Sequence, residues 1–506
     1  MSDWSSGYVT SVEYVTACYP DQAPIHLKLM ALLQGVEPPM PRGRPAYCEL
    51  GCGQGLTAIL IALTNPDTDV HAIDFMPAQI ARAKAMAADF GLDNVHFHEA
   101  SFADLAEGKG PVLPSFDYVT MHGVYSWISR DNQKAIVKFL AEKLNPGGLV
   151  YTSYNALPGW SHGIAVQRLL LDYAGLARGP AEARVTEGFD FMRRLFETKA
   201  THLEGNDLAR ELLAKPPRSA AYMAHEYLND YWRPLFFADV ARDFAEAKLE
   251  YAGTARPIDV LDQLSLSDEQ RALIDQIPDP IVAETFRDYC RLRTFRADIH
   301  VKGARRLTPA QRETRLAAVP LALTVGAADF RYDIDLPQKN VHLPDETFRP
   351  LVEALAEQGP TPLGALIRQP GYKGQPIQSM IGTIATLLMS RQVAAALPFD
   401  DDAALARCRR ANRYFAERSM ELETRQGVPV ATPALRNAHH IDSVDVIAVH
   451  LINTLADTDD VSIARRLIEF ARAGGDQGAD DGETERRLAT MIADRRRIWR
   501  HMGLID

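Results

Sequence analysis

The sequence of 506 residues predicts an α/β fold built on a mainly parallel, seven-stranded sheet with helical insertions. Strand-like apolar runs alternate with helix-like periods between residues 47 and 154, as a doubly wound sheet requires. The first run leads into a loop with three alternating glycines, and two further strand-like runs, 249–254 and 295–301, return after a long helical stretch. Right-handed crossovers would place the carboxyl ends of the parallel strands, and any ligand, at one edge of this sheet.

The core elements follow this pattern in order. Strands are expected at 47–50, 70–74, 95–98, 116–121 and 149–154, and helices at 56–63, 77–90 and 131–144. Pro77 lies in the first turn of its helix, where a missing N–H removes no hydrogen bond. The turn Pro146-Gly147-Gly148 ends a helix before the last of these strands.

The chain divides into four expected regions. They are an N-terminal arm and helix at 1–45, the ligand-binding core at 46–155, a helical lid with returning core strands at 156–305, and a winged-helix-like and helical C-terminal region at 306–506. The arm carries Tyr8, Tyr14 and Tyr19, which either pack over one edge of the sheet or reach the ligand. Their spacing favours packing.

The C-terminal region is expected to be α+β. Strands are predicted at 321–325, 330–336 and 393–397, and helices at 345–357, 361–367 and 377–391. This order resembles a winged helix, but the last of these helices has almost no Arg, Lys, Asn or Gln to read base edges. We therefore expect it to contact protein, either a substrate or a second subunit of a homodimer.

Composition places the chain among ordinary globular proteins, with 46% hydrophobic and 24% charged residues. A net charge of -11 argues against a general binder of nucleic acid or anionic membranes. No run approaches the ~18 apolar residues of a membrane span, and the N-terminus lacks the features of a signal peptide, so a cytoplasmic protein is expected. Five cysteines without a C-x-x-C pair fit reduced thiols.

The loop after the first strand indicates a nucleotide-like cofactor. Gly51, Gly53 and Gly55 allow a sharp turn and a close approach of ligand to backbone, and the following helix offers N–H groups. Their spacing is G-x-G-x-G, whereas nicotinamide and flavin sites use G-x-G-x-x-G. Glu49 precedes this loop, and Asp74 ends the next strand, where its two oxygens could hold a ribose diol.

This combination resembles the first motif of the class I S-adenosylmethionine-dependent methyltransferases, acidic-x-G-x-G-x-G. The resemblance implies a Rossmann-like sheet of seven strands, S-adenosyl-L-methionine as the cofactor and S-adenosyl-L-homocysteine as the product. It also implies that the cofactor lies along Glu49 and the glycine loop to Asp74 and Phe75. Family members hold the adenine after the third strand, where this chain has Ser101 and Phe102 but lacks the acid that many of them carry.

Two loops at the ends of the fourth and fifth strands carry the candidate catalytic side chains. These loops are His122-Gly-Val-Tyr-Ser-Trp-Ile128 and Ser153-Tyr-Asn-Ala-Leu-Pro-Gly-Trp160. The candidates are His122, Tyr125, Trp127, Tyr154, Asn155 and Trp160, with His122 also beside the cofactor. Singly, His122 could be an ordinary loop residue and the tryptophans hinge packing; their occurrence on adjacent loops favours a functional site.

Neither loop offers paired carboxylates, a Ser-His-Asp set or metal-spaced ligands, and no metal site is expected. Methyl transfer needs none of these, because it is an in-line displacement that depends on orientation and exclusion of water. Aromatic walls also attract a cationic amine or sulfonium. Asn155 is expected to orient the methyl acceptor.

Longer strings narrow the resemblance. Glu49-Leu-Gly-Cys-Gly-Gln-Gly55, the two strand-end loops and His225-Glu-Tyr-Leu-Asn-Asp-Tyr-Trp-Arg-Pro234 are similar to bacterial methyltransferases with a methyltransferase regulatory domain. The rickettsial protein-lysine methyltransferases, which modify an outer-membrane protein, belong to that group. The arm departs from the group's pattern, having Val12-Glu-Tyr-Val-Thr16 where Val-Pro-Tyr-x-Ser is commoner.

The expected function is transfer of a methyl group to an amine, with a protein lysine as the acceptor and no nucleic-acid partner or membrane insertion. A small-molecule or sugar methyltransferase and a non-catalytic cofactor-binding protein are the alternatives. A lysine enzyme needs a channel open to the surface, whereas a small-molecule enzyme closes its lid over a compact pocket. Glu226, Tyr227, Tyr231 and Trp232 of the lid either line such a channel or pack against the core, and packing is favoured for Trp232.

Overall fold

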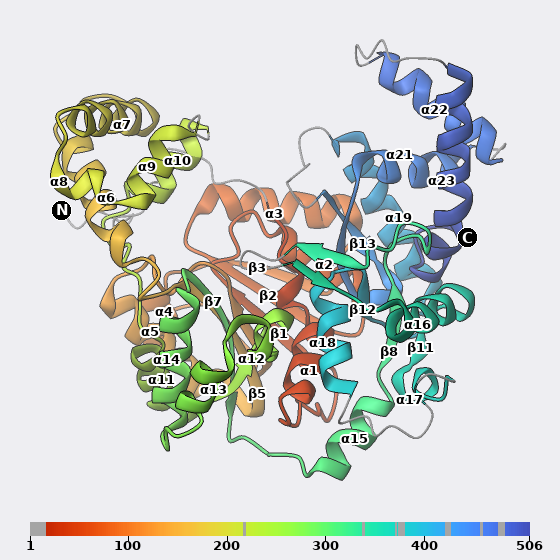
Figure 1. Cartoon of the computed structure of the whole chain (residues 1–506), viewed down its shortest axis with the longest axis horizontal. Coiled ribbons are helices and arrows are strands. Elements are labelled where there is room, and N and C mark those ends of the chain that lie inside the picture. The colour runs from red at the N-terminus through yellow and green to blue at the C-terminus, as the bar shows by residue number, and fades with distance from the viewer. Residues whose placement is uncertain are drawn as a thin grey trace.

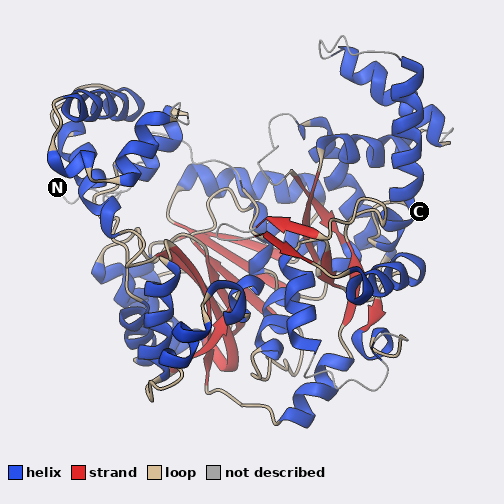
Figure 2. Ribbon diagram, viewed as in Figure 1, coloured by secondary structure: helices blue, strands red, loops and turns tan. Residues whose placement is uncertain are grey.

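The computed structural model describes residues 17–215, 219–335, 340–369, 372, 380–419, 427–455, 459–473 and 481–506. At its centre lies a seven-stranded sheet (Figures 1 and 2). Its strands are β1 (Ala46–Leu50), β2 (Asp69–Asp74), β3 (Val95–Glu99), β4 (Phe116–Met121), β5 (Leu144–Asn155), β6 (Leu249–Thr254) and β7 (Phe295–Lys302). Their order is β3-β2-β1-β4-β5-β7-β6, with only β7 antiparallel to its neighbours. The expected sheet is confirmed, including its two returning strands.

Alternation along the strands separates two apolar cores, one on each face of the sheet. Val70 and Ala72 belong to one core, whereas Ile73 and Val119 belong to the other. The helices of the first core are α1 (Pro24–Leu33), α2 (Leu56–Thr64) and α3 (Pro77–Phe90), and those of the second are α4 (Phe102–Glu107), α5 (Arg130–Lys143) and α11 (Phe237–Ala245). The helices expected at 56–63, 77–90 and 131–144 and in the N-terminal arm are present as α2, α3, α5 and α1, whereas α4 was not predicted.

Every residue of α2 is buried, because the C-terminal region covers the side that faces away from the sheet. The covering elements are α19 (Asp402–Glu417) and the hairpin of β13 (Val428–Thr432) and β14 (Asn437–Ile441). Asn65 Nδ2 donates to Arg436 O across this contact at 3.0 Å, and Cys408 Sγ donates to Leu63 O at 3.3 Å. A helix that is apolar on all sides is expected to be enclosed in this way.

The lid is a separate helical body with its own apolar core, and it stands away from most of the sheet (Figure 1). It consists of α6 (Ser161–Ala174), α7 (Ala181–Glu197), α8 (Thr201–Glu204), α9 (Asp207–Ala214) and α10 (Ala220–Tyr227). The chain then returns to the sheet through α11 and β6. A second helical insertion lies between β6 and β7 and consists of η2 (Pro257–Val260), α12 (Asp262–Ser265), α13 (Asp268–Ile274) and α14 (Pro280–Arg291).

The C-terminal region contains a three-stranded antiparallel sheet in the order β11-β8-β12. Its elements are α15 (Pro309–Ala317), β8 (Pro320–Leu323), α16 (Asp345–Gln358), β11 (Thr361–Pro362), α17 (Leu363–Leu366), α18 (Ile381–Met389) and β12 (Val393–Ala395), with a hairpin of β9 (Asp333–Asp335) and β10 (Asn340–His342). The α+β character is confirmed, while the winged-helix arrangement stays a prediction. The chain ends in α21 (Ser443–Thr454), α22 (Asp460–Ala473) and α23 (Asp481–His501).

Two further expectations concern the tyrosines of the N-terminal arm and the helix α18. Tyr8 and Tyr14 of the arm lie outside the described residues, whereas Tyr19 precedes the short 3-10 helix η1 (Pro20–Gln22). The helix expected to contact a partner, α18, has Ile384 to Leu388 buried within the C-terminal core. Its apolar surface is therefore used for packing. Within the described residues, no helix has the length and hydropathy needed to cross a membrane.

Candidate active site

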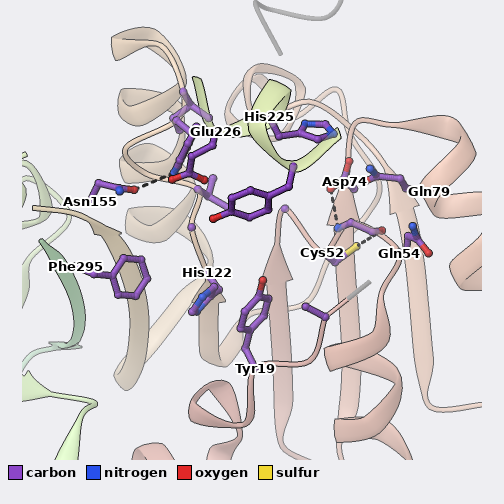
Figure 3. Close-up of a pocket in the computed structure, with 18 of the residues that line it drawn as sticks. Tyr19, Cys52, Gln54, Asp74, Gln79, His122, Asn155, His225, Glu226 and Phe295 are labelled. Carbon is purple, nitrogen blue, oxygen red and sulfur yellow. Dashed lines mark hydrogen bonds between the residues drawn. The ribbon is translucent and has the colours of Figure 1, made fainter. Parts of the chain in front are cut away.

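A cavity of about 1050 Å³ lies between the carboxyl ends of the parallel strands and the lid (Figure 3). The glycine loop and the ends of β2, β4 and β5 form its floor, and α9 and α10 contribute its upper wall. This is the sheet edge at which ligands bind in open α/β folds. Most of the residues proposed from the sequence meet here.

The glycine loop turns through left-handed backbone at φ +72°, +53° and +73°. Gly55 is required for packing, because a Cβ there would lie 2.4 Å from Phe97 Cε1 and 2.9 Å from Ala83 Cβ. At Gly53 the nearest atom would be Gln79 Oε1 at 3.6 Å, so the space beside it belongs to the cavity. One glycine therefore brings helix and strand together, and the other leaves room for a ligand.

Asp74 fastens this loop to the end of β2. Its Oδ2 accepts the Gly53 N–H at 2.9 Å and its Oδ1 accepts the Met76 N–H at 2.9 Å. Burial raises the pKa of Asp74 despite these hydrogen bonds. A carboxylate offers about four lone-pair sites, so Asp74 can still accept a hydrogen bond from a diol in the cavity.

Glu49 offers a buried carboxylate to the same cavity and is 4% exposed. Its Oε1 accepts from Gln22 Nε2 at 3.2 Å, whereas its Oε2 has no hydrogen-bond partner among the described residues. Burial raises the pKa of Glu49 to about 8, and the bond from Gln22 offsets only part of that rise. A buried, half-paired carboxylate suits a ligand that brings positive charge. The ammonium and sulfonium of S-adenosylmethionine meet this requirement, so the residues present fit the expected cofactor.

His122 stands in a column of rings. It stacks on Tyr19 with ring centroids 3.7 Å apart, and its Nδ1 lies 2.8 Å from the hydroxyl of Tyr151. Phe295 lies against its other side at 5.7 Å (Figure 3). Burial lowers the pKa of His122 to about 4, so the ring is neutral at pH 7. Tyr19 thus reaches the ligand side, although spacing alone favoured a packing role for it.

Asn155 and Trp127 form one unit of the cavity wall. Trp127 Nε1 donates to Asn155 Oδ1 at 3.2 Å, and Ser126 Oγ donates to the same oxygen at 3.3 Å. Since an indole N–H can only donate, this contact fixes which end of the Asn155 amide is oxygen. Both oxygen lone pairs are therefore occupied, and Asn155 positions Trp127 in addition to lining the cavity.

Tyr125 and Tyr154 do not line the cavity. Both side chains are fully buried, and their hydroxyls donate to Asp243 at 3.0 Å and to Asp298 at 2.7 Å. Successive side chains of a strand point to opposite faces, so Tyr154 faces away where Asn155 faces the ligand. The structure thus separates these two tyrosines from the other proposed catalytic residues, and assigns their hydroxyls to carboxylates of the core.

Tyr154 joins a buried ionic network that ties α14, in the helical insertion before β7, to the sheet. Arg296 of β7 is 1% exposed and donates to both oxygens of Asp298 and of Asp288, and to Glu284 Oε1. Asp288 and Glu284 belong to α14, so the guanidinium connects this helix to β7. Paired and hydrogen-bonded in this way, the charges can remain buried.

The remaining proposed residues lie at the cavity, though with different tasks. Trp160 packs edge-to-face on Trp232 at 5.2 Å, and Trp232 itself is buried behind the wall, as expected. Ser101 caps α4, because its Oγ accepts the Asp104 N–H at 3.1 Å and donates to Asp104 Oδ2 at 2.6 Å. Phe75 and Phe102 line the cavity. Of the lid residues left open, Glu226 and Tyr227 line it as well, whereas Tyr231 does not.

Sequence reasoning missed several residues of the wall. They include Gln54, Thr57, Gln79, Glu211, Lys215, Tyr222, His225, Thr294 and Phe295. A signal existed for Phe295, because an antiparallel seventh strand begins at the edge where the parallel strands end. The register bears this out, with Phe295 opposite Asn155. The lid residues had no such signal, since nothing in their local pattern indicates which helix face meets the core.

Two family models match the chain. A methyltransferase domain matches residues 48–150, and a predicted methyltransferase regulatory domain matches residues 219–302. The first span begins within β1 and ends within β5, and the second runs from α10 to β7. The region named regulatory therefore includes part of the lid and the returning strands of the sheet.

Known proteins extend this similarity. The uncharacterized protein sll1526 of Synechocystis is 35% identical over 378 residues, which is 74% of each chain. The uncharacterized protein RP028 of Rickettsia prowazekii is 28% identical over 43% of this chain and 86% of its own. The structure of PKMT2 from Rickettsia typhi in complex with AdoHcy has the same fold, with a TM-score of 0.69 and 18% identity over 97% of this chain and 99% of that one.

The sheet order, the glycine loop and both matched domains indicate the same family. The chain belongs to the S-adenosylmethionine-dependent methyltransferases that carry a methyltransferase regulatory domain.

Proposed function

We propose that this methyltransferase modifies an amine, and specifically the side chain of a protein lysine. The observation that carries the proposal is the extent of the cavity, which continues from the glycine loop past Asn155 to α9 and α10 of the lid. Its volume of about 1050 Å³ slightly exceeds the ~300–1,000 Å³ usual for a single small ligand. Space therefore remains for a long acceptor side chain beside a cofactor.

The chemistry of the wall suits an amine. Trp127 and Trp160 present aromatic surface, which attracts a cation and excludes water. Glu211 lies at the exposed rim, and Glu226 lies deeper on the lid side. Because Glu211 forms an ion pair with Lys215, Glu226 would contribute more of the attraction that draws a lysine ammonium inward. The fold shared with rickettsial PKMT2 supports the same class of acceptor.

The residues of the chain would act in the following way. Glu49, Asp74 and the Gly53 backbone would hold the cofactor, which supplies an electrophilic methyl group on a sulfonium. The aromatic wall would desolvate the acceptor ammonium and lower its pKa, so that the proton is released to solvent and the lone pair of the neutral amine can form the new bond to the methyl carbon. His122 stays neutral at pH 7 and so adds no positive charge beside the sulfonium. Asn155 keeps Trp127 in place, so that the acceptor approaches in one orientation.

Two measurements test the proposal. Calorimetric titration with S-adenosylmethionine should show binding that is lost in Asp74→Ala and kept in Asp67→Ala, which removes an exposed carboxylate before β2. Incubation of a bacterial lysate with enzyme and methyl-labelled cofactor, followed by mass spectrometry, should then place the label on protein lysines.

The other outcomes separate the alternatives. Label confined to small molecules would replace the lysine proposal by a small-molecule or sugar acceptor. Binding without transfer to any fraction would indicate a cofactor-binding protein without catalysis. Equal binding by wild type and Asp74→Ala would remove the proposed cofactor site itself.

A further inference from the structure

A second group of chemically active side chains lies on the sheet, away from the cavity. Asp69 and His71 stand two residues apart on β2, and His96 is the register partner of His71 on β3. Residues two apart on a strand and partners on paired strands share a face. Asp69 is five residues before Asp74, which at ~3.3 Å per residue separates the group from the cofactor end of β2 by about 16 Å.

These side chains converge on one point. Asp69 Oδ2 lies 3.3 Å from His71 Nε2, and Asp69 Oδ1 lies 3.1 Å from His96 Nε2. All three ligand atoms lie within 4.8 Å of one another. A tetrahedral zinc ion with bonds of ~2.0–2.1 Å spaces its ligands by about 3.3 Å, so each imidazole nitrogen already lies at about ligand spacing from the Asp69 carboxylate, although the two contacts use different oxygens of it. The side chain of His96 is 45% exposed and can turn to close the third.

A supporting residue stands behind the group. His71 Nδ1 lies 3.0 Å from His98 Nε2, and the two rings stack with their centroids 5.2 Å apart at 8°. A histidine that ligates metal through one nitrogen usually hydrogen-bonds through the other, which fixes the ring. His98 meets this need for His71, whose side chain is only 9% exposed.

We propose that Asp69, His71 and His96 bind a divalent transition metal of the zinc class, with His98 orienting His71. Two imidazoles and one carboxylate suit zinc, and they do not suit magnesium or calcium, which take mostly oxygen ligands. The bound ion would join β2 to β3, the edge strand of the sheet. The sequence signal is Asp-x-His on one strand facing His-x-His on the next, a pattern that spacing within either strand does not reveal.

Metal binding can be measured directly on the full-length protein without an affinity tag. The protein is stripped with a chelator, titrated with Zn²⁺ against a chromophoric competitor, and analysed for metal after washing. We expect one zinc ion per chain in wild type, with affinity at least about tenfold weaker in His96→Ala and in Asp69→Asn. His98→Ala should weaken binding by about 10- to 100-fold, the usual effect of losing an outer-shell partner.

His342→Ala is the matched control. His342 and Asp333 form an exposed pair with 2.8 Å between Nδ1 and Oδ1, and no second histidine joins them in the described residues. This variant should bind zinc as wild type does. The proposal is overturned if wild type retains no zinc after washing, or if His96→Ala and Asp69→Asn bind it as tightly as wild type. Both changes are at partly exposed positions, and unchanged S-adenosylmethionine binding will show that the variants are folded.

Discussion

Burial and the positive charge of the proposed cofactor act in opposite directions on the pKa of Glu49. Its carboxylate is enclosed, which raises its pKa to about 8, so the free protein at neutral pH holds it mostly protonated. A cationic ligand favours the ionised carboxylate of Glu49, because its positive charge attracts the negative charge and offsets the solvation that burial removed. Affinity for S-adenosylmethionine should therefore rise as pH increases through the pKa of Glu49.

Calorimetry at pH values from about 6.5 to about 9 will measure this dependence. Glu49→Gln keeps the shape and the bond to Gln22 but cannot ionise, so its affinity should be weaker and lack the Glu49 component. Any pH dependence left in Glu49→Gln reports the ligand. An identical pH profile in the two proteins would show that Glu49 does not contact the cofactor's charge.

Tyr154 should matter for stability rather than for turnover. Tyr154→Phe leaves the buried carboxylate of Asp298 with one donor fewer, at a cost of about 1–3 kcal/mol in the free energy of unfolding. Tyr118→Phe is the control, because the Tyr118 hydroxyl is equally buried but has no partner among the described residues. Its removal should be neutral or stabilising. Denaturant unfolding measures both, and a large loss of kcat at full stability in Tyr154→Phe would contradict the structural assignment.

Asn155 and Trp127 should act as one unit. Asn155→Ala and Trp127→Phe both break the Trp127 Nε1 to Asn155 Oδ1 hydrogen bond, so the double variant should lose much less activity than the product of the single losses. Each single change is expected to lower kcat about 10- to 100-fold, the range for a group displaced from its working geometry. Single-turnover rates with cofactor at saturation will measure the coupling. Additive losses would mean that the two residues act independently.

At the scale of elements, the turn between β1 and α2 needs glycine for two reasons, namely left-handed backbone and close packing. Gly53→Ala puts a side chain into left-handed backbone at a cost of about 1–2 kcal/mol. Gly55→Ala pays the same strain and also overlaps Phe97 and Ala83, which adds about 1–3 kcal/mol. We expect Gly55→Ala to lose more unfolding free energy than Gly53→Ala. For its smaller loss of stability, Gly53→Ala should lose more affinity for the cofactor. Equal stability losses would show that the β1–α2–β3 packing tolerates the extra methyl group.

The elements were predictable wherever the side-chain period carried the information. The strands, most of which are apolar runs buried on both faces, and the Pro77 helix were anticipated within a few residues, and the seven-strand topology followed from them. The exception is the start of β5, which begins at Leu144 and so includes Pro146-Gly147-Gly148, where a turn was expected. The sequence did not predict which strand-end side chain faces the ligand. Tyr154 and Asn155 differ by one position, and the twist of the sheet decides which of them meets the ligand. For α4, a run of six residues after Ser101 was too short to show a helical period.

At the scale of the molecule, the C-terminal region proves to be part of the catalytic core's support. The composition of α2, apolar apart from Thr57 and Thr64, was the signal, because a surface helix would have a polar face. What the sequence did not reveal is which segment encloses it. That partner comes from more than 340 residues further along the chain, in α19 and the β13–β14 hairpin.

This support extends to the cofactor site through a short chain of contacts. Asn437 Nδ2 of β14 donates to Pro20 O at 3.0 Å, and Pro20 begins the 3-10 helix that ends at Gln22. Gln22 in turn donates to Glu49, whose carboxylate lines the cavity. The C-terminal hairpin thus holds the segment that orients a proposed cofactor ligand, although it does not line the cavity itself.

Asn437→Ala should therefore weaken S-adenosylmethionine binding from outside the site. One hydrogen bond contributes about 0.5–1.5 kcal/mol, so the loss of affinity should be no more than about tenfold. Asn453→Ala is the matched control, because Asn453 Nδ2 donates to Leu504 O at 2.8 Å and lies in α21, which packs against α19, α22 and β13. Both variants lose one side-chain bond to a backbone carbonyl, and Asn437→Ala also loses the bond that its Oδ1 accepts from the Ala438 N–H, so its unfolding free energy should fall somewhat more. Calorimetry should find weaker cofactor binding only in Asn437→Ala, and equal affinities in the two variants would show that the hairpin stabilises the fold without reaching Glu49.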